Sequence, residues 1–417
     1  MEPTRAAGLA RLDAFLPHAG RAYRDTRNED RGSDDRSNVS LLAPYVRARL
    51  VTEAEVLRAT LSRHRLAAAE KFVAEVLWRT YWKGWLESRP IVWAHYRRDR
   101  DAAFARARAD ADLARRYDDA TCGRSGNAAL DAWARELIET NYLHNHARMW
   151  FASMWIFTLK LPWELGADFF MRHLLCGDPA SNTLSWRWVA GLQTRGKTYL
   201  ATRENVRRYT HGRLDPGAHL ATEAPALAGP AYGPGKLPTL DLAPHDDAPA
   251  LLVLHDDDVG VESLPLAHLD VRASIGLLAA TGRSSSSPSD AVIAFARGAI
   301  ADGLSRAPHG DCSMIVEAVD AERVARELLK HARTCDTPLV IVPYAPVGPV
   351  RDLLVDVAPR LEREGVRVRE IGRRFDATVW PYATRGFFNL KEHIAELLET
   401  LGLVETRGSV QETFFVK

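Results

Sequence analysis

The residue pattern of this 417-residue chain changes near residue 215, and that change constrains the fold more than any other feature. Before it, apolar residues recur at the spacing of amphipathic helices. After residue 249, short β-rich runs alternate with helical stretches, which is typical of an open parallel α/β sheet. The residues between are rich in Pro, Gly and Ala, as in a linker. We therefore expect an all-helical domain over 1–215, a linker over 216–249 and an α/β domain over 250–417.

Local signals place the main elements. Thr52 and Glu55 have the form of a capping box, and Asp178 and Pro179 that of an N-cap and first-turn residue. We expect a solvated loop at Arg24–Asn38. Helices of the first region are expected at 53–66, 69–86, 128–139, 143–160 and 164–175. The second region should contain strands at 250–254, 314–319, 339–342 and 366–371, and helices at 290–304, 321–333, 350–364 and 390–401.

Charge and tryptophan are distributed unevenly along the chain. Residues 1–215 contain 35 Lys and Arg against 26 Asp and Glu, whereas residues 216–417 contain 20 against 28. Ten of the 11 tryptophans lie in the first of these regions. The basic, Trp-rich half is therefore the one that could attract an anionic polymer.

Several classes of protein do not fit this sequence. No run approaches the roughly 18 apolar residues of a membrane span, and the N-terminus lacks the regions of a signal peptide. No P-loop or dinucleotide-binding glycine motif is present. The dispersed cysteines argue against a disulfide framework, a zinc knuckle or an iron–sulfur cluster, so we expect a cytoplasmic protein. They are Cys122, Cys176, Cys312 and Cys335.

The expected helix 69–86 carries the first group of candidate functional residues. Glu75, Trp78, Arg79 and Trp82 share one face of it. A ligand with flat rings and phosphates would suit such a face. An amphipathic helix with its tryptophans in the core explains the same spacing.

Two further groups follow along the chain. Asn145, Arg148 and Met149 share a helix face, whereas His144 and His146 point to different sides and make a poor chelate, so no metal site is expected. Residues 176–188 combine a helix N-terminus, an acid, an amide and two indoles. A helix N-terminus can hold anionic or acceptor atoms of a cofactor. A capped helix with aromatic packing explains this segment equally well.

Four segments in this order resemble the helical FAD-binding domain of the photolyase/cryptochrome flavoproteins, over roughly residues 11–210. The family's phosphate loop, T-S-x-L-S-P-Y-L, corresponds to VSLLAPYV at 39–46, and its Glu-x-x-Trp-Arg helix to residues 75–79. Its W-M-H-N-R-x-R-M corresponds to YLHNHARM at 142–149, and its D-x-D-x-A-x-N-x-x-x-W-Q-W to residues 176–188. Matching order and separation make the resemblance specific.

The resemblance implies FAD as the cofactor and leaves open whether an antenna chromophore is bound. Six residues correspond to FAD contacts of the family. Tyr23 and Ser40 correspond to residues at the diphosphate, Arg79 and Arg148 to residues along the flavin, and Asp178 and Asn182 to residues at the isoalloxazine edge.

In the DNA-repairing members of the family, five corresponding residues contact a cyclobutane pyrimidine dimer: Glu75 and Asn145 by polar contacts, Met149 by touching it, and Trp78 and Trp188 by stacking. A flipped-out dimer needs flat aromatic walls and a few polar contacts, so the residue types agree with the chemistry. Trp186 and Trp163 correspond to the first two members of the family's electron-relay chain. Trp93 is our candidate for the third.

The sequence also departs from the family's pattern. Val39 and Ala43 replace two hydroxyl residues of the phosphate loop. Cys176 stands where the family has an aspartate that pairs with the arginine matching Arg148, which alters the field around the flavin. His146 replaces an arginine that helps to hold the DNA backbone, so phosphate contact should be weaker.

The order of the expected domains is unusual for the family, in which an α/β antenna domain normally precedes the FAD domain. Here the α/β region follows, and we interpret 250–417 as a candidate relocated antenna-like domain. Residues 255–258 (HDDD) end its first strand, where α/β sheets often bind ligands. We favour a polar turn after a buried strand, because the Asp spacing does not fit a calcium loop.

Three functions are consistent with these observations. The leading hypothesis is a deoxyribodipyrimidine photolyase-like lyase, which repairs pyrimidine dimers with light and FAD, binds damaged DNA and has no membrane partner. The alternative is a cryptochrome-like FAD photoreceptor that signals to a partner through the C-terminal domain. The third is a flavin-free structural relic. Substitution of Glu75 should abolish repair under the first hypothesis and leave partner binding intact under the second.

Overall fold

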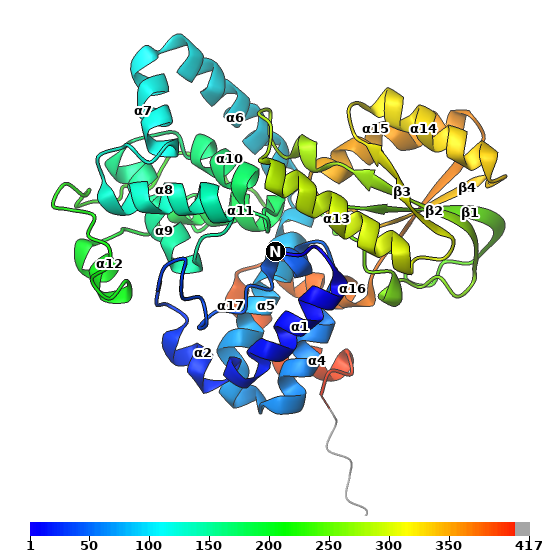
Figure 1. Ribbon diagram of the computed structural model, residues 1–417, viewed down its shortest axis with the longest axis horizontal. Helices are drawn as coiled ribbons and strands as arrows, with labels where there is room; N and C mark the ends of the chain where they lie inside the picture. Colours follow the sequence, from blue (N-terminus) through cyan, green and yellow to red (C-terminus); the bar gives the residue numbers. More distant parts are fainter. Residues whose placement is uncertain (405–417) are drawn as a thin grey trace, which may run out of the picture.

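The computed structural model describes residues 1–404, which form a helical part and a five-stranded sheet with its flanking helices (Figure 1). The helices of the first half are α1 (Arg5–Phe15), α2 (Arg21–Thr26), α3 (Ala43–Arg47), α4 (Glu53–Arg63), α5 (Leu66–Glu87), α6 (Ile91–Ala109), α7 (Ala111–Thr121), α8 (Ala128–Thr140), α9 (Asn145–Ser153), α10 (Trp163–His173), α11 (Pro179–Val189) and α12 (Arg203–Tyr209). No described helix is long and apolar enough to cross a membrane.

Capping interactions define the helix starts that position the site. Thr52 accepts a hydrogen bond from the backbone N–H of Glu55, whose side chain bonds back to Thr52, so the predicted capping box is confirmed. Asp178 likewise accepts from the backbone N–H of Ser181 at 2.7 Å, and Pro179 is the first residue of α11. The predicted start of this helix is therefore confirmed as well.

Two predictions about the first half are wrong in part. The expected helix 143–160 ends at Ser153 and continues as a wider π-helical turn over Met154–Thr158, after which Lys160 adopts a left-handed conformation with φ 51°. The expected solvated loop 24–38 begins inside α2, and Asp30 within it is buried and accepts a hydrogen bond from Trp133 Nε1 at 2.9 Å. Helices α1, α6 and α7 were not expected; the apolar periodicity of α1 and α6 is weak, whereas that of α7 is strong and was overlooked.

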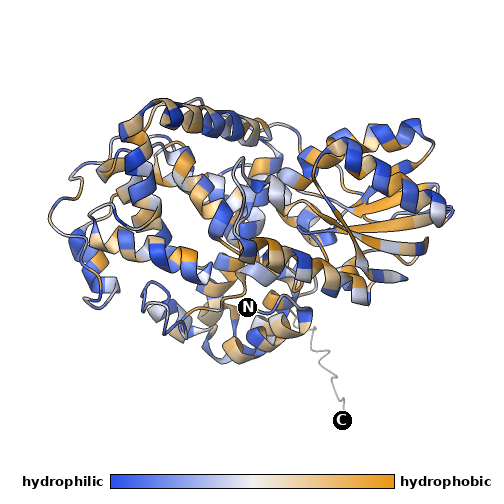
Figure 2. Ribbon diagram, turned by 45° about the horizontal axis from the view of Figure 1, so that its top comes forward, coloured by the Kyte–Doolittle hydropathy of each residue, from blue (hydrophilic) through white to orange (hydrophobic). Residues whose placement is uncertain are grey.

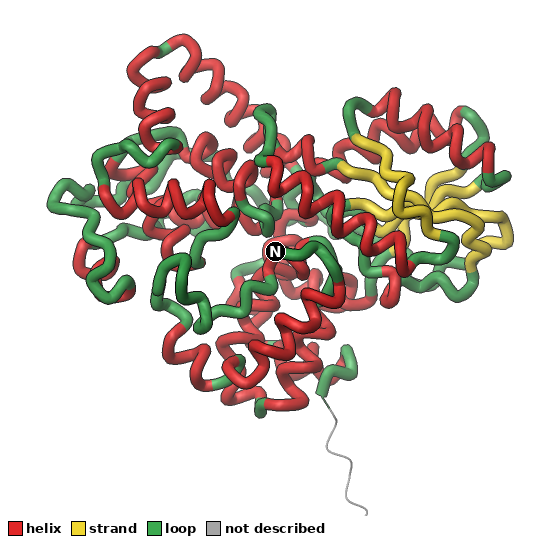
Figure 3. The backbone as a smooth tube through the Cα atoms, viewed as in Figure 1, coloured by secondary structure: helices red, strands yellow, loops and turns green. Residues whose placement is uncertain are grey.

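The second half contains a parallel sheet with strand order β3-β2-β1-β4-β5 (Figure 3), so the expected open parallel α/β architecture is confirmed. Its strands are β1 (Asp246–His255), β2 (Leu269–Leu278), β3 (Gly310–Glu317), β4 (Leu339–Pro343) and β5 (Arg367–Ile371). Strand β2 was not expected, because polar and partly exposed residues such as Asp270 and Arg272 interrupt its apolar run.

Alternate residues of β1 face two separate cores. Leu251 and Val253 pack with α14 (Ala321–Thr334) and α15 (Pro349–Arg363) on one side of the sheet. Leu252 and Leu254 pack on the other side with α13 (Asp290–Arg306) and with α1 and α3 of the N-terminal region. The central strands β1 and β4 are accordingly apolar along most of their length (Figure 2). The N-terminal helices therefore share a core with the sheet.

The last helices return to the helical part. They are α16 (Arg374–Val379), α17 (Phe387–Glu392) and α18 (Ile394–Thr400), so the single helix expected over 390–401 is interrupted at His393. Figure 1 shows α17 beside α5, and a Cβ atom on Gly84 of α5 would lie 2.7 Å from the Trp380 ring. The division at 216–249 stays a prediction, and residues 405–417 of the expected α/β domain lie outside the described residues.

Candidate functional site

The turn between α10 and α11 brings Cys176, Gly177 and Asp178 into the interior of the helical part. Asp178 is 5% exposed, and its Oδ2 lies 3.5 Å from Arg79 Nη1 on α5. Burial alone would raise the pKa of Asp178, but the charges of Lys83, Arg79 and Arg47, together with the hydrogen bond from the Ser181 backbone, lower it overall. Asp178 is therefore an ionised carboxylate at neutral pH, held by cations from the neighbouring helix.

Cations outnumber carboxylates around this turn. Arg148 of α9 donates from Nε to the Leu143 carbonyl at 2.9 Å and from Nη2 to the Cys176 sulfur at 3.3 Å, so its buried neighbour is a thiol. Arg79 Nη1 is buried without a hydrogen-bond partner, and Lys83, 3% exposed, has no acidic partner within 4 Å in the described part of the chain. A cation-rich donor set of this kind fits an anionic group such as a diphosphate.

The other residues expected to contact the flavin or its diphosphate differ in how deeply their side chains are buried. Asn182 is buried and donates from Nδ2 to the Ala167 carbonyl at 2.8 Å, which fixes the direction of its amide. Ser40 is half-buried and accepts a hydrogen bond from the Leu42 backbone at 3.4 Å. Tyr23 packs edge-on against Phe72 of α5. Asn182 is thus bonded to the neighbouring helix α10, Ser40 is bonded within its own loop, and Tyr23 lies in an aromatic cluster.

A continuous series of contacts links expected substrate side chains of α5, α9 and α11, and we call the region along it the rim. Arg27 pairs with Glu75 of α5 at 2.5 Å, and the next residue, Asn28, accepts a bond from His146 of α9 at 2.9 Å. The other nitrogen of His146 lies 3.2 Å from the Tyr199 hydroxyl, and Tyr199 stacks on Trp188 of α11 at 5.7 Å. Asn145, exposed, is the first residue of α9, and Met149, half-buried, follows one turn later on the same face.

Trp78 lies beside this rim but is covered on one face. Its ring stacks on Phe387 of α17, with ring centroids 3.7 Å apart and planes at 10°. Phe387 comes from the C-terminal region, and no local sequence signal connects it with α5. The expected stacking surface of Trp78 is therefore already occupied on one side by the chain's own side chain.

Three functional neighbours were missed by sequence reasoning, and two had a recognisable signal. Arg27, the C-cap residue of α2, lies four residues after Tyr23, and Lys83 lies four residues after Arg79 on α5, so each continues a helix face that was already of interest. Phe387 had none.

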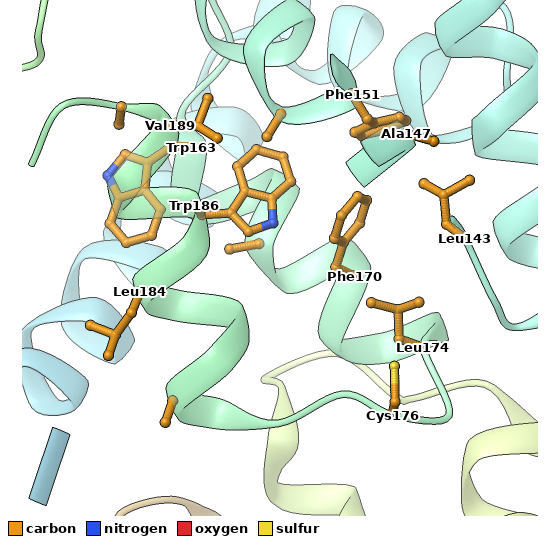
Figure 4. Close-up of a cluster of buried hydrophobic side chains, with 14 of the residues drawn as sticks. Leu143, Ala147, Phe151, Trp163, Phe170, Leu174, Cys176, Leu184, Trp186 and Val189 are labelled. Atoms are coloured by element: carbon orange, nitrogen blue, oxygen red, sulfur yellow. The ribbon is translucent and has the colours of Figure 1, made fainter. Parts of the chain in front are cut away.

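The tryptophans expected to carry electrons lie in one apolar cluster (Figure 4). Trp186 is 2% exposed and packs directly against Gly166 of α10, one turn after Trp163. The Trp163 ring is 5.6 Å from Tyr96, and Tyr96 is 5.4 Å from Trp93. Trp93 Nε1 in turn donates to Asp352 of α15 at 2.8 Å. The aromatic series therefore continues beyond Trp163 to the edge of α15.

The two histidines beside the rim are neutral at physiological pH. Burial lowers the pKa of His146, and it lowers the pKa of His144 to about 4. His144 caps α9 by accepting a hydrogen bond from the His146 backbone at 3.2 Å. His146 therefore brings no positive charge to a DNA backbone at neutral pH.

Acid should weaken the fold through His144. Its folded pKa lies below the unfolded value of about 6.5, so its contribution is complete above that pH and is lost as the pH falls toward 4. His144→Asn keeps a capping acceptor without titrating. Denaturant unfolding at pH 7 and pH 4.5 should show that the variant loses about 2 kcal/mol less than the parent. Exposed His219→Asn is the control, and equal losses in all three proteins would contradict the assignment.

Two cavities lie elsewhere on the molecule. One, of about 610 Å³, is lined by Arg203, Arg207 and Arg208 of α12. The other, of about 650 Å³, lies between α14 and α15. Neither cavity is lined by the residues expected to contact FAD. The fit of FAD to this chain therefore rests on the cationic side chains around Asp178, which are Arg79, Lys83 and Arg148. Among the described residues, no group of three or more His, Cys, Asp or Glu side chains is arranged to hold a metal ion.

Part of the chain is similar to proteins of known family. Residues 72–217 match the family model of the FAD binding domain of DNA photolyase. The chain is 35% identical over 166 residues to the deoxyribodipyrimidine photo-lyase of Streptomyces griseus, which covers 39% of this chain and 35% of that protein. It is 33% identical over 248 residues to an enzyme of the same name from Thermus thermophilus, covering 58% of this chain and 54% of the relative. The chain thus spans about half or less of the length of these relatives.

Two solved structures are also similar to parts of the chain. A bacterial class III photolyase from Agrobacterium tumefaciens is 26% identical, with a TM-score of 0.41, over 50% of this chain and 43% of that one. A cryptochrome from Synechocystis is 22% identical, with a TM-score of 0.38, over 49% and 43%. Residues 72–217 are therefore similar to the FAD binding domain of DNA photolyase, and this match supports FAD as the cofactor.

Proposed function

We propose that the protein is a light-driven, FAD-dependent enzyme that repairs cyclobutane pyrimidine dimers in DNA. One observation carries the proposal: exposure separates the expected side chains into a rim and an interior. The expected dimer contacts are all partly or fully exposed: Glu75, Trp78, Asn145, Met149 and Trp188. The flavin-edge and relay side chains are all buried: Asp178, Asn182, Trp163 and Trp186. This arrangement suits a flipped-out pyrimidine dimer held above an enclosed cofactor.

The chain's own residues would perform distinct tasks in this reaction. Reduced FAD supplies a light-excited electron donor when it is bound. Arg79 and Arg148 would neutralise its negative charge, and Asp178 would accept a hydrogen bond from its edge. Glu75 and Asn145 would hydrogen-bond the dimer and stabilise the charge it gains. Ring opening returns the electron, so the reaction has no net redox change.

A basic helix next to the rim supports a nucleic-acid substrate. Tyr209 of α12 packs against His146 at 5.1 Å, and Asn205 accepts a bond from Trp150 of α9 at 2.9 Å. The exposed guanidinium groups of Arg203, Arg207 and Arg208 therefore lie on an element that contacts the rim, and Asp215 pairs with Arg203 at 2.7 Å and with Arg207 at 3.8 Å. They would hold phosphates on either side of a dimer, which makes binding sensitive to salt.

Glu75→Gln should lower the rate of dimer repair about tenfold or more without lowering FAD occupancy. Burial raises the pKa of Glu75 while Arg27 opposes the shift, and the variant removes the charged acceptor without changing its size. Repair is measured as the light-dependent recovery of thymine absorbance in ultraviolet-damaged oligothymidylate under reductant. Glu70→Gln is the matched control, since Glu70 lies on the same helix and pairs with Lys391 at 2.8 Å.

Two outcomes would contradict this proposal, the first for the role of Glu75 and the second for repair itself. If the Glu70 and Glu75 variants repair at the same rate as the parent, Glu75 does not contact the dimer. If the parent binds FAD but shows no recovery of thymine absorbance, the photoreceptor function is favoured. The stack of Phe387 on Trp78 and the thiol at Cys176 are the observations that favour that second function.

A further inference from the structure

The carboxyl edge of the parallel sheet faces the turn that carries Asp178. Open α/β sheets usually bind ligands at this edge, next to the strands where the order reverses. In this chain β1 and β4 are those strands, and His255 at the end of β1 bonds to the Pro343 carbonyl at the end of β4. The three aspartates that follow His255 are 1–8% exposed, so they form a buried turn.

Arg47 at the end of α3 inserts into this edge. Its guanidinium lies 2.6 Å from Asp257 Oδ1 and donates to the Asp256 carbonyl at 2.5 Å. The remaining nitrogen, Nε, donates to the Gly177 carbonyl at 2.8 Å. One planar group thus connects the sheet edge with the residue directly before Asp178. A planar fork of fixed donors is suited to such bridging, and lysine could not replace it.

A second arginine, Arg49, pairs with the third aspartate and makes no bond to the turn that carries Asp178. Arg49 pairs with Asp258 at 2.9 Å and with Asp376 at 2.5 Å, and Arg373 pairs with Asp258 at 2.6 Å. Within the described residues, none of these side chains contacts Gly177 or Asp178. Asp257 and Asp258 are therefore neighbours with the same chemistry and similar burial, but only Asp257 acts on Arg47.

The turn that carries Asp178 also packs against the start of α15. A Cβ atom on Gly348, at the start of α15, would lie 2.8 Å from the Pro179 ring. Pro179 follows Asp178 directly, so the residues on both sides of Asp178 contact this edge. Small movements of the edge would therefore change the direction of the Asp178 carboxylate.

We propose that Arg47, held by Asp256 and Asp257, is a positioning residue that sets the orientation of Asp178 toward the isoalloxazine edge of FAD. The α/β part thereby takes part in forming the flavin site, and its usual ligand edge serves to dock the helical part. This inference rests on the proposed role of Asp178 in binding FAD. It assigns residues 255–258 to a structural connection and not to a metal or a small ligand.

The test compares Asp257→Asn with Asp258→Asn in the full chain. Both variants remove one buried carboxylate charge without a change of size, so both should lose stability. FAD is titrated into apoprotein, and the dissociation constant and the absorption band of the bound flavin are recorded. Asp257→Asn should weaken FAD binding about tenfold and shift the band, whereas Asp258→Asn should leave both unchanged. Arg47→Lys keeps the charge but loses the bridge, so it should resemble Asp257→Asn and serves if that variant does not fold.

The outcomes separate this inference from the proposed function. If the parent protein binds FAD and all three variants bind it equally well, Arg47 is not a positioning residue, and the proposed function is untouched. If the Asp257 and Asp258 variants lose affinity alike, the effect follows stability and the inference is wrong. If the parent itself binds no FAD after reconstitution, both the inference and the proposed function fail.

Discussion

Replacing Arg49 with methionine should lower the free energy of unfolding by about 3–5 kcal/mol. Arg49 is 3% exposed and is the only partner of Asp376 within 4 Å among the described residues. Its removal would leave that carboxylate buried without a positive charge, which costs far more than the loss of one surface contact. Denaturant unfolding at pH 7, followed by circular dichroism, measures the change.

Arg333→Met is the matched control for this experiment. Arg333 pairs with Glu364 at 2.7 Å, but both side chains are more than half exposed. Water screens this pair, so the same substitution should cost less than about 1 kcal/mol. Equal losses in the two variants would show that the buried ionic cluster adds nothing beyond a surface pair. Because Arg49 also has φ 56°, the ion pairs must outweigh a backbone conformation that is unfavourable for a side chain.

Local sequence signals predicted the elements that hold the site. The capping groups at Thr52 and Asp178, and the i, i+4 face of Glu75 and Arg79, depend on residues within one or two turns of one another. Such signals are readable because the hydrogen bonds they imply are made within the same helix. The parallel sheet was predictable in the same way, since the apolar runs of β1 and β4 stand out against their flanks.

Contacts between distant segments could not be predicted. Arg27 and Glu75 are 48 positions apart, and Phe387 reaches Trp78 only because the last helices return to α5. Residues 255–258 fitted a polar turn in sequence, yet the structure buries them because Arg47 and Arg49 supply compensating charges from the other half of the chain. A buried carboxylate and a solvated one look the same in sequence when the partner is more than 200 positions away.

Trp186→Phe should slow the light-driven reduction of bound FAD by about tenfold or more, which corresponds to a barrier increase of about 1.4 kcal/mol. We propose Trp186 as the first electron donor to the excited cofactor, and phenylalanine is too difficult to oxidise to replace an indole. The measurement is the decay of flavin absorbance in blue light with an external reductant present. FAD occupancy, determined separately, should be unchanged.

Trp380→Phe is an unusually close control for that variant. Trp380 is 1% exposed and Trp186 is 2% exposed, and both bury an indole nitrogen that has no hydrogen-bond partner among residues 1–404. The two substitutions should therefore cost similar stability, while only the first interrupts electron transfer. If both variants are reduced as fast as the parent, electrons reach FAD by another route. If Trp186→Phe slows reduction as expected, slowing by Tyr96→Leu but not by Tyr96→Phe would locate the next step beyond Trp163, because an aromatic ring at that position would be required to reach Trp93.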